Sequence, residues 1–362
     1  MTTTEPQIEI EVHLAANGSA TMAREIRRGL CADPKELAPK YFYDERGSRL
    51  FEEITALPEY YPTRAERSIL AERSAEILAA AGDPAMLVEL GSGSAAKTRH
   101  LLRAMRDAGC LETYAPVDIS EEITHQTAES LVEEFPGLAI RGLVCDFEQH
   151  LERVPNGVEG RLIAFLGGTI GNLYPRPRRD FLSRIAALLG PRDRLLLGAD
   201  LVKDTARLEA AYDDSQGVTA EFNKNVLAVL NRELGADFDP AAFEHVARYD
   251  AGEARMDIRL RSLAEQTIHV EGLEIDVDFA AGEEMRTEIS SKFTRERLEA
   301  IFVEAGLEMS GWFTDRDGDY ALSLARALAR TRSAGSREGC SPECSGKLDL
   351  SLPGIGMECP AM

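Results

Sequence analysis

A short glycine-containing segment, residues 86–94, is the part of the sequence best suited to chemistry. It reads Met-Leu-Val-Glu-Leu-Gly-Ser-Gly-Ser. Its apolar first half predicts a buried strand, and its second half leads into a predicted helix. Ligands of parallel sheets bind at the carboxyl ends of the strands. Gly91 and Gly93 permit positive φ and let a cofactor approach the main chain without meeting a Cβ atom. The segment therefore indicates a loop that binds a nucleoside cofactor, and dinucleotide enzymes use a similar turn.

Residues beyond the loop distinguish between two cofactor classes. Ala96 stands where a dinucleotide-binding loop carries its third glycine, which disfavours close packing of a pyrophosphate. Asp118 ends the next predicted strand and offers a carboxylate to the ribose hydroxyls, which both classes require. Asp146 and Phe147 follow the third predicted strand and supply a carboxylate for an adenine amino group and a ring for stacking. Together they favour S-adenosylmethionine over nicotinamide, and Lys97 is then expected near the cofactor's carboxylate.

Two of these residues also fit purely structural roles. Asp118 is suited to cap the helix that begins near Ser120. Lys97 is compatible with a solvated position on the helix after the loop.

The elements that must position these residues alternate between strand and helix from residue 86 onward. Short apolar segments predict strands at 86–90, 113–117, 139–144, 161–166 and 194–199. Helical spacing predicts helices at 98–108, 120–135, 149–154 and 178–189. Such alternation implies an α/β fold in which a parallel sheet is covered by helices on both faces.

The segment before this core is expected to be helical. Apolar residues at helical spacing predict helices at 23–30, 48–57 and 64–80. Two tyrosine clusters, 41–44 and 58–63, lie outside these helices. They suit either a pocket wall or lid, or rings that fill a helical core.

After residue 204 the alternation breaks and later resumes. Residues 205–285 hold a helical run, 205–234, and strands are predicted at 243–249, 254–260 and 266–270. An insertion of this size is a natural place for substrate-binding structure. Thr294 is then a plausible cap of a helix that Gly306 closes, and a hairpin of strands at 309–314 and 320–325 follows. A helix followed by a terminal antiparallel hairpin resembles the end of class I methyltransferase folds.

Bulk properties exclude several classes of function. The 362 residues carry a net charge of −21, which argues against a nucleic-acid partner. No apolar run approaches the length of a membrane span, so we expect no membrane partner. Isolated cysteines, Cys31, Cys110 and Cys145, are typical of a reduced cytoplasmic protein, and no metal site is expected. We also expect a monomer and a disordered tail at 333–362.

Several separated segments resemble the L-histidine Nα-methyltransferase family, which forms hercynine at the start of ergothioneine biosynthesis. The similarity runs from about residue 20 to 330. The matching segments are 39–44, 47–51, 57–64, 167–172, 198–200, 217–223 and 286–290. Within the second half, Ile258 stands near a position where the family leads us to expect methionine.

The resemblance implies a fold, a domain division and roles for named residues. The fold is a Rossmann-like class I methyltransferase core with a second, smaller α+β substrate domain. The substrate domain would comprise 20–62 and 205–285, and the cofactor domain 63–204 and 286–330. The residues implied to bind S-adenosylmethionine are Gly91, Lys97, Asp118, Asp146 and Phe147. Those implied to bind histidine are Tyr61, Asn172, Tyr212, Glu288, Ile289 and Ser290, with Tyr61, Asn172 and Tyr212 as the catalytic residues.

Within that set, the resemblance places Asn172 and Tyr212 at the carboxylate and amine end of histidine. Tyr61, Glu288 and Ser290 would line the imidazole end. This makes independent sense, because Glu288 and Ser290 would face the same way on a strand and could address both ring nitrogens. An exposed carboxylate on an edge strand is the alternative for Glu288.

The implied reaction is transfer of three methyl groups in succession to the α-amino nitrogen of L-histidine. The principal alternative is an Nα-methyltransferase for another amino acid or amine on the same scaffold. A catalytically silent protein that binds S-adenosylmethionine and regulates another is the second alternative.

Overall fold

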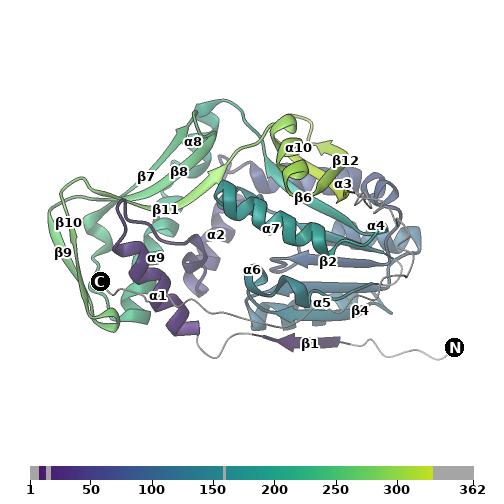
Figure 1. Ribbon diagram of the computed structural model, residues 1–362, viewed down its shortest axis with the longest axis horizontal. Helices are drawn as coiled ribbons and strands as arrows, with labels where there is room; N and C mark the ends of the chain where they lie inside the picture. The colour runs from purple at the N-terminus through teal and green to yellow at the C-terminus, as the bar shows by residue number, and fades with distance from the viewer. Residues whose placement is uncertain (1–7, 14–17, 158–159, 329–362) are drawn as a thin grey trace, which may run out of the picture. The chain divides into compact units, whose positions relative to one another are not determined.

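The computed structural model describes residues 8–13, 18–157 and 160–328. Its central feature is an eight-stranded sheet with the strand order β1-β4-β3-β2-β5-β6-β13-β12 (Figure 1). The strands β1 to β6 run parallel to one another, and β13 is antiparallel to both β6 and β12. Their bounds are β1 Ile8–Val12, β2 Met86–Leu90, β3 Thr113–Asp118, β4 Ala139–Val144, β5 Arg161–Phe165, β6 Arg194–Asp200, β12 Leu307–Thr314 and β13 Tyr320–Ala327. The expected α/β fold is confirmed.

Helices cover both faces of this sheet, because its strands are apolar on both sides. Every residue of β2 and β5 is buried. Leu87 belongs to one hydrophobic cluster with the helices α3, α4 and α5. Its neighbours Met86 and Val88 belong to the opposite cluster with α7 and α10. The bounds are α3 Pro62–Ala81, α4 Arg99–Ala108, α5 Glu121–Glu134, α6 Phe147–His150, α7 Pro175–Leu188 and α10 Arg295–Glu304.

A second group of elements has its own core. A three-stranded antiparallel sheet has the order β11-β8-β7, and a hairpin pairs β9 with β10. Side chains of α1, α2 and α9 pack with these strands in a third hydrophobic cluster. The bounds are α1 Gly18–Leu30, α2 Glu45–Ala56, α8 Thr205–Tyr212, α9 Val218–Leu234, β7 Phe243–Asp250, β8 Arg255–Ser262, β9 Gln266–Val270, β10 Ile275–Phe279 and β11 Glu284–Ser291.

Short 3-10 helices complete the secondary structure of the described residues. They are η1 Pro39–Phe42, η2 Leu151–Arg153, η3 Thr169–Asn172, η4 Pro240–Ala242 and η5 Glu271–Leu273. The helix predicted at 149–154 is therefore mostly wrong, since α6 ends at His150 and η2 replaces the rest.

The predicted caps of α10 are confirmed. The Thr294 hydroxyl accepts a hydrogen bond from the amide of Arg297 at 3.2 Å. Gly306 has a φ of 82°, in the left-handed region that glycine enters without strain.

One expectation about the insertion is corrected, and two strands were not expected. The helical run predicted at 205–234 is two helices, α8 and α9, because the Asp214 carboxylate accepts backbone amides in the turn between them. β10 was not predicted, and neither was β1 at the edge of the large sheet.

The expected domain division remains a proposal. Strand β11 crosses the expected boundary between residues 285 and 286, and the described residues up to Leu328 form one compact unit. The expected tail, 333–362, lies outside the described residues. Among the residues that the structure describes, no helix is both long and apolar enough to cross a membrane.

Candidate active site

The predicted cofactor loop connects β2 to α4 and is bonded to the end of β3. Gly91 and Gly93 have φ values of 72° and 49°, so both use the freedom that the sequence analysis assigned to them. The Gly91 amide donates to the Val117 carbonyl at 2.8 Å, and the Gly93 amide donates to the Asp118 carboxylate at 2.8 Å. The main chain of the loop therefore turns at the carboxyl edge of the sheet, where ligands bind.

Asp118 orients the loop and does not cap α5. The cap is Ser120, whose hydroxyl accepts from the Ile123 amide at 3.3 Å. The two Asp118 oxygens accept one amide each, from Gly93 and from Ser120 at 3.0 Å. Because each carboxylate oxygen has two lone pairs, one lone pair on each oxygen is left for a ligand's hydroxyl groups.

A buried glutamate that the sequence analysis missed holds the base of the loop. The Glu89 carboxylate accepts hydroxyl hydrogen bonds from Thr98 and from Tyr114, both at 2.6 Å. Burial raises the pKa of Glu89 to about 7, although both hydroxyl groups oppose the shift. The bonds connect β2 to the start of α4 and to β3.

Asp146 and Phe147 lie beside the same loop. Asp146 caps the short helix α6 by accepting the Glu148 amide at 2.9 Å. A Cβ atom at Gly91 would lie 3.9 Å from the Phe147 ring, so the two residues are neighbours. The Phe147 ring itself packs against Phe165, with 5.5 Å between ring centroids. The Phe147 ring thus stands at the loop, the Asp146 carboxylate precedes it in the chain, and the expected contact of both with adenine stays a prediction.

Lys97 is half-buried and paired, so the solvated alternative is wrong. Its ammonium group contacts the carboxylate of Glu66, a side chain of α3 with no exposed surface. The other Glu66 oxygen accepts the Gly167 amide at 2.8 Å and the Tyr320 hydroxyl at 3.0 Å. Glu66 was not predicted, although it falls four residues before the buried Leu70 on the apolar face of α3.

A second cluster of polar side chains surrounds Asp200 at the end of β6. The Tyr61 hydroxyl donates to the Asp200 carboxylate at 2.8 Å, and Lys203 donates to the Tyr61 hydroxyl at 2.6 Å. Lys292 pairs with the second Asp200 oxygen at 2.7 Å. Burial alone would raise the pKa of Asp200, but the two ammonium groups outweigh it and lower this pKa. Asp200 ends the matching segment 198–200, and the sequence alone assigns it no role.

Tyr212 and Ser290, from α8 and β11, meet beside Lys292. Their hydroxyl oxygens lie 2.8 Å apart, and the Lys292 ammonium donates to both at 2.8 Å. Three predicted residues, Tyr61, Tyr212 and Ser290, are therefore joined through Lys292 and Asp200.

Glu288 lies on the same face of β11 as Ser290. It is only partly exposed, although β11 is an edge strand of its sheet, and it accepts a hydrogen bond from Asn172. Burial raises its pKa to about 7, while the Lys292 charge and the Asn172 bond lower it in part. Ile258 faces Glu288 across the strand pair and packs in a cluster with Tyr61 and Tyr212.

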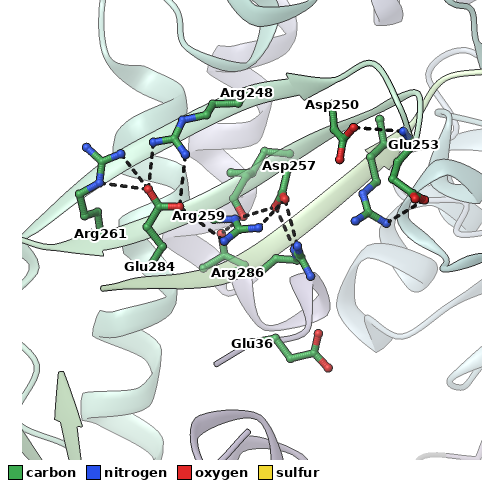
Figure 2. Close-up of polar contacts among 12 residues, drawn as sticks. Glu36, Arg248, Asp250, Glu253, Asp257, Arg259, Arg261, Glu284 and Arg286 are labelled. Atoms are coloured by element: carbon green, nitrogen blue, oxygen red, sulfur yellow. Dashed lines mark hydrogen bonds and ion pairs between the residues drawn. The ribbon is translucent and has the colours of Figure 1, made fainter. Parts of the chain in front are cut away.

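Ile289 points to the opposite face of the sheet. It pairs with Asp257, whose carboxylate bonds Arg259 and Arg286 on that face (Figure 2). Its predicted role in histidine binding stays a prediction, and only its main chain lies beside Glu288 and Ser290.

The two tyrosine clusters differ in their surroundings: a residue of the first lies in a helical core, and a residue of the second lies in the polar site. Phe42, within the first cluster, is buried in the core of α2 and α9. Tyr61, within the second cluster, lies in the polar site at Asp200.

One loop, residues 167–172, reaches both groups of residues. A Cβ atom at Gly167 would lie 3.7 Å from the Lys97 ammonium nitrogen. At the other end of the loop, a Cβ atom at Gly171 would lie 3.5 Å from the Ser290 hydroxyl. Lys97, predicted to bind the cofactor, and Ser290, predicted to bind the substrate, therefore border a common segment of chain.

Comparison with known proteins gives the family. Residues 22–327 match the model of the family described as "Histidine-specific methyltransferase, SAM-dependent". A histidine N-alpha-methyltransferase of Mycolicibacterium smegmatis is 54% identical over 314 residues, which cover 86% of this chain and 97% of that protein. One of Mycobacterium tuberculosis is 50% identical over 88% of this chain and 99% of its own length. Ergothioneine biosynthesis protein 1 of Neurospora crassa is 31% identical over 83% of this chain and 34% of its own length.

These matches confirm the expected Rossmann-like methyltransferase fold and the expected cofactor, S-adenosylmethionine. The residues at the loop fit that cofactor, because they offer carboxylates, an aromatic ring and an ammonium group near two loop positions, Gly91 and Gly93, that carry no Cβ atom. The chain is an enzyme that belongs to the SAM-dependent, histidine-specific methyltransferase family.

Proposed function

We propose that the enzyme methylates the α-amino nitrogen of L-histidine three times and so forms hercynine, the first step of ergothioneine biosynthesis. The observation that carries this proposal is the pair formed by Glu288 and Ser290 on one face of β11, beside Tyr212 and Asn172. The names of the mycobacterial relatives support histidine as the substrate, and the name of the fungal relative supports the pathway.

The ring of histidine fits the polar groups of β11. An imidazole has two nitrogens that donate or accept according to protonation. A carboxylate and a hydroxyl two residues apart on a strand lie on one face and can bond both nitrogens. An amino acid without these nitrogens would leave both groups unpaired, at about 1–3 kcal/mol each.

The amine needs orientation more than it needs a strong base. An α-amino group has a pKa of roughly 7.7–8.0 in peptides, and the free carboxylate of an amino acid raises it to about 8–9, so a minority of the amine is already neutral near pH 7. The cofactor supplies a methyl group already activated on a sulfonium sulfur. The protein then has to hold the amine in line with that methyl group, a task for which Asn172, Tyr61 and Tyr212 are placed.

The site must also accept a cation that grows with each transfer. Tyr61 and Tyr212 offer aromatic faces, which attract methylated ammonium groups. Lys203 lies 4.2 Å from the Tyr61 centroid and Lys292 lies 4.5 Å from the Tyr212 centroid, so the methylated ammonium group would contact the parts of these rings that the two lysines leave open.

The test is mass spectrometry of the purified enzyme incubated with S-adenosylmethionine and each of the twenty amino acids. We expect histidine alone to gain three methyl groups. Stronger turnover of tryptophan or tyrosine would instead support an Nα-methyltransferase for another amino acid.

The cellular setting is part of the proposal. We place the enzyme in the cytoplasm, as the free thiols of Cys31, Cys110 and Cys145 favour a reducing compartment. The expected monomer is tested by light scattering of the purified protein.

A further inference from the structure

Lys292 is a buried cation to which neither the sequence nor the proposed chemistry has given a role. Its side chain has no exposed surface. Its ammonium nitrogen lies 2.7 Å from Asp200, 2.8 Å from the Tyr212 hydroxyl and 2.8 Å from the Ser290 hydroxyl. An ammonium group has three hydrogens and no lone pair, so these contacts use all of its hydrogen-bonding capacity.

The contacts restrict what Tyr212 and Ser290 can offer to a ligand. Each hydroxyl has one hydrogen and two lone pairs. Lys292 occupies one lone pair on each. The bond between the two hydroxyls, at 2.8 Å, uses one hydrogen and one further lone pair. One hydrogen and one lone pair therefore remain, and they are on different atoms: the hydroxyl that donates keeps a lone pair, and the other keeps its hydrogen.

We propose that Lys292 is a positioning residue for substrate selection, which fixes Tyr212 and Ser290 so that together they present one donor and one acceptor to the amino acid. This inference rests on the proposed function, because both hydroxyls are assigned to histidine there. If a substrate group accepts a hydrogen bond from one hydroxyl, the other hydroxyl has no free hydrogen left and can only accept a hydrogen bond from the substrate. The two contacts are thus coupled, and an amino acid that brings two acceptors or two donors to this place leaves one of them unpaired.

Asp200 makes this arrangement possible. A buried ammonium group without a counter-charge is costly, and the Asp200 carboxylate provides one at 2.7 Å. Lys203 reaches the other oxygen of the same carboxylate at 2.5 Å but contacts Tyr61 and the Leu201 carbonyl, and neither of the two hydroxyls. The two lysines share a counter-ion and differ in their hydroxyl partners.

The experiment is a double-mutant cycle. Tyr212→Phe, Ser290→Ala and the double variant are prepared in the unsubstituted enzyme, in Lys292→Met and in the matched control Lys203→Met. The KM for histidine and the Kd for S-adenosylmethionine are measured for each. Met has a similar length to Lys, and Lys203 remains to neutralise Asp200 in the Lys292 variant.

We expect the effects of Tyr212→Phe and Ser290→Ala on KM to be coupled about tenfold in the unsubstituted enzyme, as contacting hydrogen-bonded residues commonly are. The coupling should fall below about twofold in Lys292→Met, because the freed lone pairs let each hydroxyl adapt alone, and should persist in Lys203→Met. The Kd for the cofactor should change less than about threefold in Lys292→Met. Equal coupling in all three backgrounds overturns the inference, as does a cofactor Kd that changes as much as KM.

Two further outcomes are informative. If Lys292→Met does not fold, as judged by its thermal transition, the cycle in the unsubstituted enzyme still decides, since additive effects there overturn the inference. If the unsubstituted enzyme does not methylate histidine, the proposed function fails first and the inference fails with it.

Discussion

Asp118 and Glu288 are expected to act on different ligands, since Asp118 bonds the predicted cofactor loop and Glu288 lies on the strand proposed to face the substrate. Asp118→Ala removes the acceptor beside Gly93 and should raise the Kd for S-adenosylmethionine about tenfold or more, with a smaller effect on the KM for histidine. Glu288→Ala should do the reverse and weaken the preference for histidine. Calorimetric cofactor binding and steady-state kinetics measure the two effects, and equal effects from both variants would contradict this division of the site.

The raised pKa of Glu288 predicts a conflict between binding and stability. Its pKa of about 7 lies above the ordinary value of 4.5, so the charged carboxylate costs the folded state free energy. That cost is absent below pH 4.5, grows between pH 4.5 and 7, and is complete above pH 7. Glu288→Gln should therefore raise the thermal midpoint more at pH 8 than at pH 5, while it weakens histidine binding.

A matched control for this prediction is Glu133→Gln, which changes an exposed glutamate of α5. The control should shift the midpoint little at either pH. A midpoint that falls at pH 8 in Glu288→Gln would show that the carboxylate stabilises the fold.

The sequence could reveal residues that belong to a local pattern, but not those defined by contacts between distant segments. Asp118 follows an apolar strand and Gly93 lies in a loop motif, so both could be recognised. Lys292 and Glu66 carry no such local signal, because their roles depend on Asp200 and Lys97, which only the fold brings near them. Asp200 could have been predicted from the sequence, since it ends an apolar strand just as Asp118 does.

At the scale of elements, the three-stranded sheet shows two different faces. One faces the substrate residues, and the other carries a network of arginines and acids that includes Asp257, Arg259, Arg286 and Glu284 (Figure 2). Burial would raise the pKa of Asp257, but hydrogen bonds from Arg286 and Arg259 lower it to about 2. The Asp257 carboxylate therefore holds β8 and β11 together on the face away from the site.

This network predicts an acid-dependent loss of stability. The ordinary pKa of aspartate is 3.8, so the stabilisation by Asp257 is complete above that pH and is lost as pH falls through about 2. Asp257→Asn should lower the free energy of unfolding by about 2 kcal/mol at pH 7, and the difference should shrink between pH 4 and pH 2. Urea unfolding at several pH values measures it.

The comparison for Asp257 is Asp180→Asn on α7, where the partner Arg179 is largely exposed. Exposed pairs contribute little, so this variant should change stability by less than about 0.5 kcal/mol. A loss that is the same at pH 2 and pH 7 would mean that Asp257 does not act through its charge.

Elements with strong local periodicity were predicted well, and those that depend on distant partners were not. The boundaries of β2 and β4 match the expected strands residue for residue. β1 is five residues long and is held at the sheet edge by pairing with β4, from Ile8 opposite Ile140 to Val12 opposite Val144. β10 alternates apolar and acidic residues and is a strand through its pairing with β9. Such short segments become strands only when a distant partner is in place.

At the scale of the whole molecule, the enzyme must hold two ligands in one geometry, and the loop 167–172 borders residues predicted to bind each of them. Its first glycine lies near Lys97 and its last near Ser290. β6 also contributes to both sides, because Gly198 packs against Glu66 while Asp200 bonds Tyr61 and Lys292. In-line transfer requires the reacting atoms to lie roughly 3–3.5 Å apart. Small shifts of either segment should therefore lower the rate of methyl transfer.

Two glycine substitutions separate these contributions by adding one methyl group to each segment. A Cβ atom at Gly171 would lie 2.9 Å from the Ser291 carbonyl of β11, so Gly171→Ala should displace the substrate strand and raise the KM for histidine about tenfold. A Cβ atom at Gly198 would lie 2.4 Å from the Glu66 carboxylate, which pairs with Lys97, so Gly198→Ala should mainly raise the Kd for S-adenosylmethionine. Gly137→Ala, where a Cβ atom would meet nothing within 4 Å but φ is 91°, controls for strain without a new contact near the site. If Gly171→Ala and Gly198→Ala lowered cofactor and histidine binding in the same proportion, the two segments would not act on separate ligands, and the site would have to be described as a single unit.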